Sequence, residues 1–174
     1  AVHHTIAPAV YAKLTYDLEK DFEPIAVIAM VPHIVSVNPQ KIPAKTLKEF
    51  IAYLKANPGK VSFGSAGNGT SHHLTGEMFK GLTGTDILHV PYKGAGPMMQ
   101  DLLGGQIDMA FDGLGTSSAQ IKAGKLVGLG VAAPKRSEAL PDVPTAAEAG
   151  VPGFETSAWY GVWAVAGTPQ PIVD

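Results

Sequence analysis

The feature that most constrains the fold is a repeated alternation of short β-branched segments with helix-forming segments, which begins at Val61 and continues through most of the chain. Gly and Pro residues separate the segments, and the helical ones carry apolar residues at helical spacing. The predicted strands of this region are Val61–Gly64, Ile87–Val90, Ile107–Phe111 and Leu126–Ala133, and the predicted helices are Ser71–Leu82, Gly96–Leu103 and Ser117–Ala123. This order predicts an α/β fold with a mainly parallel sheet flanked by helices and joined by right-handed crossovers.

The segments outside this region are less regular. A capping box of Thr46 and Glu49 opens the clearest helix, which Asn57-Pro58-Gly59 ends. Strands are predicted at Ile25–Met30 and Ile34–Val37 with a bend at Pro32, and a last strand at Ser157–Val165. Short helices are predicted at Ile6–Leu14 and Thr145–Ala149. The buried stripe of the Ser71–Leu82 helix is predicted to be Leu74, Met78, Phe79 and Leu82.

Composition excludes several classes of site. The 13 Lys and Arg residues stand against 15 Asp and Glu residues, so the net charge of −2 argues against a nucleic-acid partner. Arg136 is the only arginine, which excludes a site built on several guanidinium groups. Cysteine is absent, so thiolate metal sites, thiol catalysis and disulfides are excluded. Nothing at the start resembles a signal peptide, and we expect either that it was removed or that the chain does not begin at the native N-terminus.

The segment Ser65–Ser71, with the sequence Ser-Ala-Gly-Asn-Gly-Thr-Ser, is the strongest candidate site. It lies between a predicted strand and the start of a predicted helix, where free main-chain amides and the helix dipole favour an anion. A carboxylate suits such donors better than a triphosphate. The alternative is a tight turn with a good helix cap. Because ligands bind beyond the carboxyl ends of parallel strands, Pro91–Gly94 and Asp112–Thr116 are expected at the same edge.

Three other chemistries fit these loops less well. Neither a P-loop nor a dinucleotide-binding glycine pattern is present, so no nucleotide cofactor is predicted. Ser65 suggests a small α/β serine hydrolase with His72, His89 and Asp112 as base and orienting groups, although the nucleophile elbow requires glycine where Phe63 stands. No metal site is predicted, because the adjacent pairs His3/His4 and His72/His73 point apart on regular secondary structure.

The remaining candidates each have a structural alternative. His33 and His89 are predicted to be hydrogen-bonded structural histidines, whereas His72 is as well suited to ligand contact as to capping. Lys93 offers positive charge to an acid and Tyr92 a ring and a hydroxyl, against a solvated lysine and a half-buried tyrosine. Asp112 suits a ligand amine or, more commonly, a helix cap.

Several motifs, in this order, resemble those of the Bug-type extracytoplasmic solute receptors of tripartite tricarboxylate transporters. They are Ser65–Ser71, His89–Gly94, Asp101–Asp112, Lys135–Thr145, Trp159–Gly161 and Ala166–Pro169. The resemblance runs along practically the whole chain. It implies one lobe of a two-lobed, venus-flytrap periplasmic-binding-protein fold of type II-like architecture. In that reading residues 1–23 come from the first lobe or hinge, 24–156 form the second ligand-binding lobe, and 157–174 return toward the first lobe.

The family resemblance also implies a function, without catalysis or a cofactor. A periplasmic receptor of this kind closes on a small carboxylate, such as a di- or tricarboxylate, an acidic amino acid or an aromatic acid, and passes it to membrane permease subunits. Ser65, Ala66, Gly67, Asn68, Gly69, Thr70 and Ser71 would hold a carboxylate, with His72, Tyr92, Lys93, Asp112 and His4 near the cleft. Gly113 departs from the Asn of many relatives, which puts contacts from that loop in doubt. A single lobe is expected to bind weakly and to self-associate through its exposed interlobe face.

Overall fold

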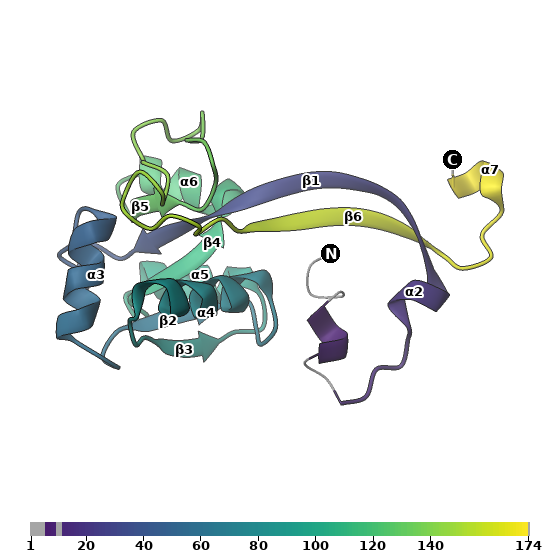
Figure 1. The fold of residues 1–174 in the computed structure, drawn as a ribbon, viewed down its shortest axis with the longest axis horizontal. Helices are drawn as coiled ribbons and strands as arrows, with labels where there is room; N and C mark the ends of the chain where they lie inside the picture. Colours follow the sequence, from purple (N-terminus) through teal and green to yellow (C-terminus); the bar gives the residue numbers. More distant parts are fainter. Residues whose placement is uncertain (1–5, 10–11, 174) are drawn as a thin grey trace.

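A layered lobe and a long two-stranded ribbon make up the computed structural model, which describes residues 6–9 and 12–173 (Figure 1). The strands are β1 (Phe22–Val37), β2 (Ser62–Ser65), β3 (Leu88–Pro91), β4 (Met109–Gly113), β5 (Val127–Val131) and β6 (Ser157–Val165). The longer helices are α3 (Leu47–Ala56), α4 (Ser71–Thr83), α5 (Ala95–Leu103) and α6 (Leu114–Lys122). Two single-turn helices, α2 (Leu18–Asp21) and α7 (Gln170–Val173), lie near the far end of the ribbon (Figure 1).

The sheet of the lobe has the strand order β3-β2-β4-β1-β5. Strand β2 pairs in parallel with β3 and β4, whereas β1 is antiparallel to both β4 and β5. Consequently β3, β2, β4 and β5 run in one direction, as predicted, and β1 lies reversed between two of them. The reversed strand was not predicted, because neither the length nor the composition of a strand records its direction.

Helices cover both faces of this sheet. Successive side chains of a strand point to opposite faces, and here apolar side chains point to both. On one face Leu47, Phe50 and Leu54 of α3 and Phe79 of α4 pack on Phe63 and Phe111. On the other face the core consists of Met98 and Leu102 of α5 with Ile107 and Ala110, and of Ile34, Leu114 and Val131. The α/β prediction, with helices on both sides of the sheet, is therefore confirmed.

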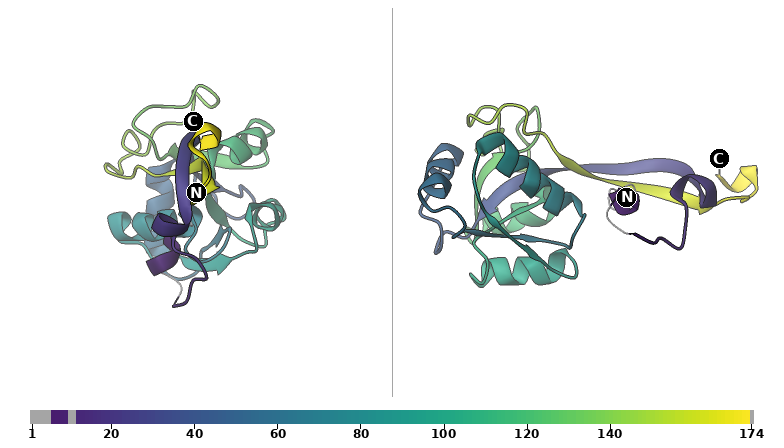
Figure 2. Two further views of the ribbon diagram at one scale, coloured as in Figure 1. Left: turned by 90° about the vertical axis from the view of Figure 1, so that its right-hand side faces the viewer. Right: turned by 60° about the horizontal axis from the view of Figure 1, so that its bottom comes forward.

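The ribbon is formed by the first part of β1 and by β6, which pair antiparallel from Phe22↔Val165 to Pro32↔Ser157 (Figures 1 and 2). The two strands predicted around Pro32 are thus one continuous strand, and Pro32 stands where the ribbon meets the lobe. Val27, Ile28 and Met30 are 62%, 67% and 68% exposed, so both faces of β1 carry uncovered apolar side chains. Self-association through the interlobe face stays a prediction, as do the proposed divisions of the chain at 23/24 and 156/157.

Two predicted helices were wrong or too long. Residues 6–9 are helical, but 12–14 are not, and 10–11 lie outside the described residues. The segment Thr145–Ala149 is a turn rather than a helix, although Thr145 and Glu148 form the hydrogen bonds expected of a capping box.

No helix in the ranges 6–9 and 12–173 is both long and apolar enough to cross a bilayer.

The predicted stripe of α4 was also wrong in most positions. Phe79 is fully buried, but Leu74, Met78 and Leu82 are 42%, 36% and 48% exposed. The buried face of α4 consists instead of Thr75, Gly76, Phe79 and Thr83. The helix lies so close to the sheet that small residues are required there, and this closeness cannot be read from hydropathy.

Gly76 provides a test of this close approach. A Cβ atom at Gly76 would lie 2.3 Å from Phe63 Cε2, whereas one at Gly81 of the same helix would meet nothing within 4 Å. We expect Gly76→Ala to lower the free energy of unfolding by about 1–3 kcal/mol through overpacking. The matched control Gly81→Ala should raise it by roughly 0.5–1 kcal/mol, because alanine favours the helix. Urea unfolding of both variants measures this, and equal effects at the two positions would contradict the packing described.

Candidate functional site

The candidate site lies at the sheet edge where β2, β3 and β4 end. Because these strands are parallel, the loops that follow them meet there, as predicted. The amide of Tyr92 donates to Ser65 O at 2.9 Å, and that of Gly94 donates to Ala66 O at 3.1 Å. From the third loop, Asp112 Oδ1 lies 3.4 Å from His72 Nε2.

The loop's own amides are largely engaged, contrary to the expectation that they would be free. Ala66 N donates to His72 Nδ1 at 3.2 Å, and Gly69 N donates to His73 Nδ1 at 3.1 Å. Gly67 N donates to Ser65 Oγ at 3.1 Å, and Thr70 N donates to Gly67 O at 3.3 Å. Gly67 has φ +134°, a conformation that requires glycine. The loop is therefore a structured turn.

Main-chain amides without an acceptor lie just after the loop, in the first turn of α4. The Thr70 hydroxyl donates to Gly67 O at 2.7 Å and makes no capping bond to the helix. Within the described ranges, the amides of Ser71, His72 and His73 donate no hydrogen bond. These amides and the positive end of the helix dipole are suited to an anion.

The same edge holds two more helix starts of this kind. Helix α5 begins after Gly94 and α6 after Gly113, and neither has a side-chain cap. Helix α3 follows the reversed strand β1, so it begins at the opposite edge, and there Thr46 and Glu49 form a complete capping box. The uncapped N-termini thus gather where the predicted ligand loops meet.

Four histidines surround the loop. His33 Nε2 lies 3.2 Å from Ser71 Oγ, and its Nδ1 lies 3.4 Å from Thr75 Oγ1. The His33 and His72 rings meet edge to face at 5.6 Å, and the His73 and His89 rings stack at 3.9 Å. The prediction that His33 and His89 are hydrogen-bonded structural residues is confirmed. Sequence reasoning gave His73 no role, because two adjacent histidines were expected to point apart, whereas both reach back to the loop.

Burial favours the uncharged form of three of these rings, His33, His72 and His89. Burial, reinforced by His72, lowers the pKa of His33 to about 4. Burial also lowers the pKa of His72, against an opposing effect of Asp112. For His89, burial and then His73 lower the pKa to about 4. The rings of His33, His72 and His89 are consequently hydrogen-bonding groups rather than cations at neutral pH.

Ser65 and His89 form the contact that the hydrolase alternative requires. Ser65 Oγ lies 2.6 Å from His89 Nε2. However, the Ser65 side chain is fully buried and also bonds to Gly67. The carboxylate of Asp112 faces His72 instead of His89, so base and orienting acid do not form one chain.

The other predicted site residues have internal partners or lie at the rim. Asp112, which is 1% exposed, accepts hydrogen bonds from the hydroxyls of Thr116 and Ser117, the latter at 2.7 Å. The Tyr92 hydroxyl donates to Asp101 at 2.8 Å, and burial followed by Asp101 raises the pKa of Tyr92 to about 12. Asn68 and Lys93 are exposed, and Lys93 makes no ion pair to a described residue. His4 lies outside the described residues. Ligand contact by this set stays a prediction.

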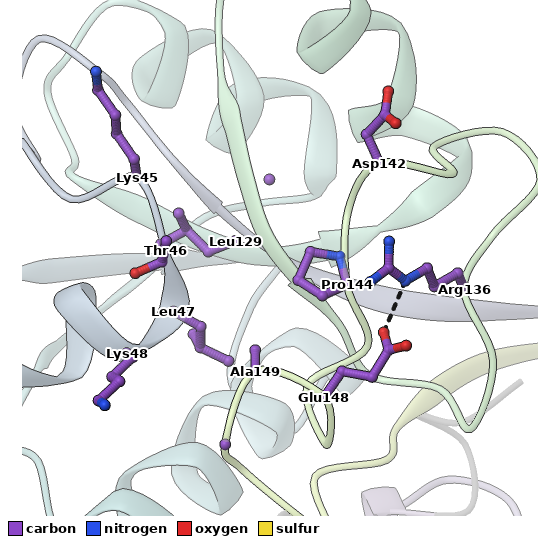
Figure 3. Close-up of a pocket in the computed structure, with 12 residues that line it drawn as sticks. Lys45, Thr46, Leu47, Lys48, Leu129, Arg136, Asp142, Pro144, Glu148 and Ala149 are labelled. Carbon is purple, nitrogen blue, oxygen red and sulfur yellow. Dashed lines mark hydrogen bonds and ion pairs between the residues drawn. The ribbon is translucent and has the colours of Figure 1, made fainter.

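A separate cavity of about 610 Å³ lies beside the start of α3 and the loop from Arg136 to Gly150 (Figure 3). Its single guanidinium is already bound, since Arg136 Nε donates to Glu148 at 2.8 Å and Arg136 Nη1 donates to Pro141 O at 3.1 Å. Among the described residues, no group of three His, Asp or Glu side chains is placed to hold a metal ion.

Comparison with known proteins identifies the family. The model of the tripartite tricarboxylate transporter family receptor matches residues 1–174. The chain belongs to this receptor family. A relative from Agrobacterium vitis is 41% identical over 94% of this chain and 47% of its own length, and BugT of Bordetella pertussis is 36% identical over 92% and 49%. The chain spans about half the length of the curated relatives it matches.

Solved structures of similar proteins agree with the lobe described above. A Rhodopseudomonas palustris protein with adipate has 40% identity and a TM-score of 0.90, covering 94% of this chain and 54% of the neighbour. The periplasmic binding protein BugD has 38% identity and a TM-score of 0.92, covering 99% and 57%. MatC from Rhodopseudomonas palustris with bound malate has 36% identity and a TM-score of 0.87, covering 97% and 57%. The fold is therefore one lobe of a periplasmic binding protein.

The neutral histidines make the stability of this receptor lobe depend on pH. Because burial lowers the pKa of His33 from 6.5 to about 4, its contribution is present above pH 6.5 and is lost as the pH falls toward 4. We expect His33→Gln, which keeps a donor near Ser71 but does not titrate, to reduce the loss between pH 7.5 and 4.5 by about 2 kcal/mol. Urea unfolding at both pH values measures this. An equal loss in both proteins would contradict a neutral His33.

Proposed function

We propose that this chain is the second lobe of a solute receptor, which captures a small carboxylate at the edge formed by Ser65–Ser71, Pro91–Gly94 and Asp112–Thr116. The observation that carries the proposal is the set of uncapped helix N-termini at this edge, above all the three free amides of α4. Two relatives of high structural similarity were solved with adipate and with malate, which are dicarboxylates.

The chemistry of the edge suits a carboxylate with several weak donors rather than one strong cation. Main-chain amides at Ser71, His72 and His73 supply directed hydrogen bonds, and the exposed Lys93 supplies charge. A helix terminus contributes about 0.3–1 kcal/mol for an exposed anion, so one lobe alone is expected to bind weakly. The remainder of the receptor supplies the opposite wall of the cleft in this proposal.

The biological setting is part of the same proposal. The receptor works outside the cytoplasm, in the periplasm, and passes its ligand to permease subunits in the membrane. It is a binding protein and catalyses no reaction. The family match and the similarity to periplasmic binding proteins support this assignment.

Ser71 allows the main-chain contact to be tested directly. Proline fits the first helical position, and Thr70 before it has φ −76° and ψ 163°, which a following proline tolerates. Ser71→Pro removes the amide and the hydroxyl, whereas the matched control Ser71→Ala removes only the hydroxyl. In titrations with adipate and malate, we expect half-saturation in the millimolar range for the wild type. We expect a further weakening of about tenfold for Ser71→Pro relative to Ser71→Ala.

Amide shifts in two-dimensional NMR spectra provide the measurement, with sodium chloride at equal ionic strength and the uncharged adipamide as controls. The wild-type changes should centre on residues 71–73. Equal affinities of the two variants, or changes confined to another surface, would contradict the proposed site.

The contact between Ser65 and His89 justifies a test of the hydrolase alternative. Because Ser65 is fully buried and His89 lacks a carboxylate partner among the described residues, we expect no hydrolysis of p-nitrophenyl acetate above the rate in buffer. Turnover that disappears in Ser65→Ala but persists in Ser71→Ala would favour the enzyme instead.

A further inference from the structure

The first turn of α4 contains two side chains that reach back to the loop preceding it. His72 and His73 occupy the second and third helical positions, and their Nδ1 atoms lie 3.2 Å from Ala66 N and 3.1 Å from Gly69 N. An amide N–H can only donate, so each Nδ1 must accept and carry no proton. Each ring is therefore neutral, with its proton on Nε2.

Other groups fix both rings in these orientations. The Nε2 of His72 lies 3.4 Å from Asp112 on β4, and the ring meets His33 on β1 edge to face. The ring of His73 stacks on His89 of β3, and its Nε2 lies 4.0 Å from Glu77, which itself pairs with Lys80. The titratable and charged groups facing the two histidines are thus His33, Asp112, His89, Glu77 and Lys80.

We propose that His72 and His73 are positioning residues that act as acceptors for the loop amides of Ala66 and Gly69, and that protonation of either ring releases its end of the loop. The arrangement resembles a capping box in which the acceptors come from the helix and the donors from the loop. By binding these two amides, the rings hold the turn that leads into α4, so that the amides of residues 71–73 stay open to an anion. That last consequence rests on the proposed function, whereas the hydrogen bonds themselves do not.

Acid is expected to break the hydrogen bonds between the loop amides and the two Nδ1 atoms. A protonated imidazole donates from both nitrogens, so its Nδ1–H would oppose an amide N–H and the hydrogen bond would be lost. Burial lowers the pKa of His72 from 6.5, although Asp112 opposes this shift, so the bond to Ala66 should persist below pH 6.5 before it is lost. Loosening of the loop is thus expected in acid and not at neutral pH.

Amide hydrogen exchange of the whole chain tests the proposal without any ligand. In His72→Leu, which lacks an acceptor, we expect the protection factor of Ala66 N–H to fall by roughly five- to tenfold, with Gly69 unchanged. His73→Leu should show the converse. Asparagine places its Oδ1 near the position of Nδ1 and does not titrate, so His72→Asn should retain protection and keep it in acid. Gly81→Ala is the control, because Gly81 lies on the same helix and a Cβ atom there would meet nothing within 4 Å.

Each outcome decides the matter. Protection lost in His72→Leu but retained in His72→Asn supports the proposal, whereas protection unchanged in His72→Leu or lost in both overturns it. Should a variant fail to fold, the side-chain ¹⁵N spectrum of the wild type decides, since a proton on Nδ1 of either ring overturns the assignment. In titrations with adipate, His72→Leu should weaken binding several-fold. If the wild type does not bind adipate, the proposed function fails while the exchange data still test the two histidines.

Discussion

The reversed strand β1 is the constraint on which the site depends. With β1 antiparallel inside the sheet, the helix that follows it starts at one edge, and the helices that follow β2, β3 and β4 start at the other. The α3 start satisfies its amides with Thr46 and Glu49, whereas α4, α5 and α6 start without side-chain caps. Unpaired amides raise the free energy of a helix end unless water or a ligand binds them. The fold therefore places the uncapped starts of α4, α5 and α6 at the same edge.

Two histidines at this edge provide acceptors for amides of the loop. A loop with several buried amides needs acceptors, and carboxylates in that place would repel an anionic ligand. Neutral imidazoles accept hydrogen bonds without adding negative charge. His72 and His73 bind loop amides in this way, and the deeply buried carboxylate of Asp112 is surrounded by two hydroxyls and by His72. The two imidazoles thus hold the loop without adding negative charge beside the proposed carboxylate site.

The two-stranded ribbon of β1 and β6 exposes apolar side chains of β1. An isolated two-stranded ribbon is marginally stable in water, and here both faces of its β1 strand expose apolar side chains such as Val27 and Ile28. At its base, His33 N donates to Thr156 O and Thr75 Oγ1 donates to Thr156 Oγ1, so the ribbon is hydrogen-bonded to the second turn of α4. A movement of the ribbon would thus displace His33, whose ring contacts Ser71. The base of the ribbon is therefore in direct contact with the first two turns of α4, where the proposed carboxylate site lies.

Much of this organisation was predictable from sequence, and the rest was not for identifiable reasons. Strand and helix order follow from local patterns, and the meeting of the three loops follows from parallel strands. The direction of β1 could not be predicted, because it depends on which neighbours the strand finds. The stripe of α4 was misassigned because hydropathy favoured Leu74 and Met78, whereas contact with Phe63 requires Gly76. The loop amides were expected to be free because sequence shows donors but not the acceptors that reach them. A histidine at the second or third position after a glycine-rich loop is the one signal that would have pointed to those acceptors.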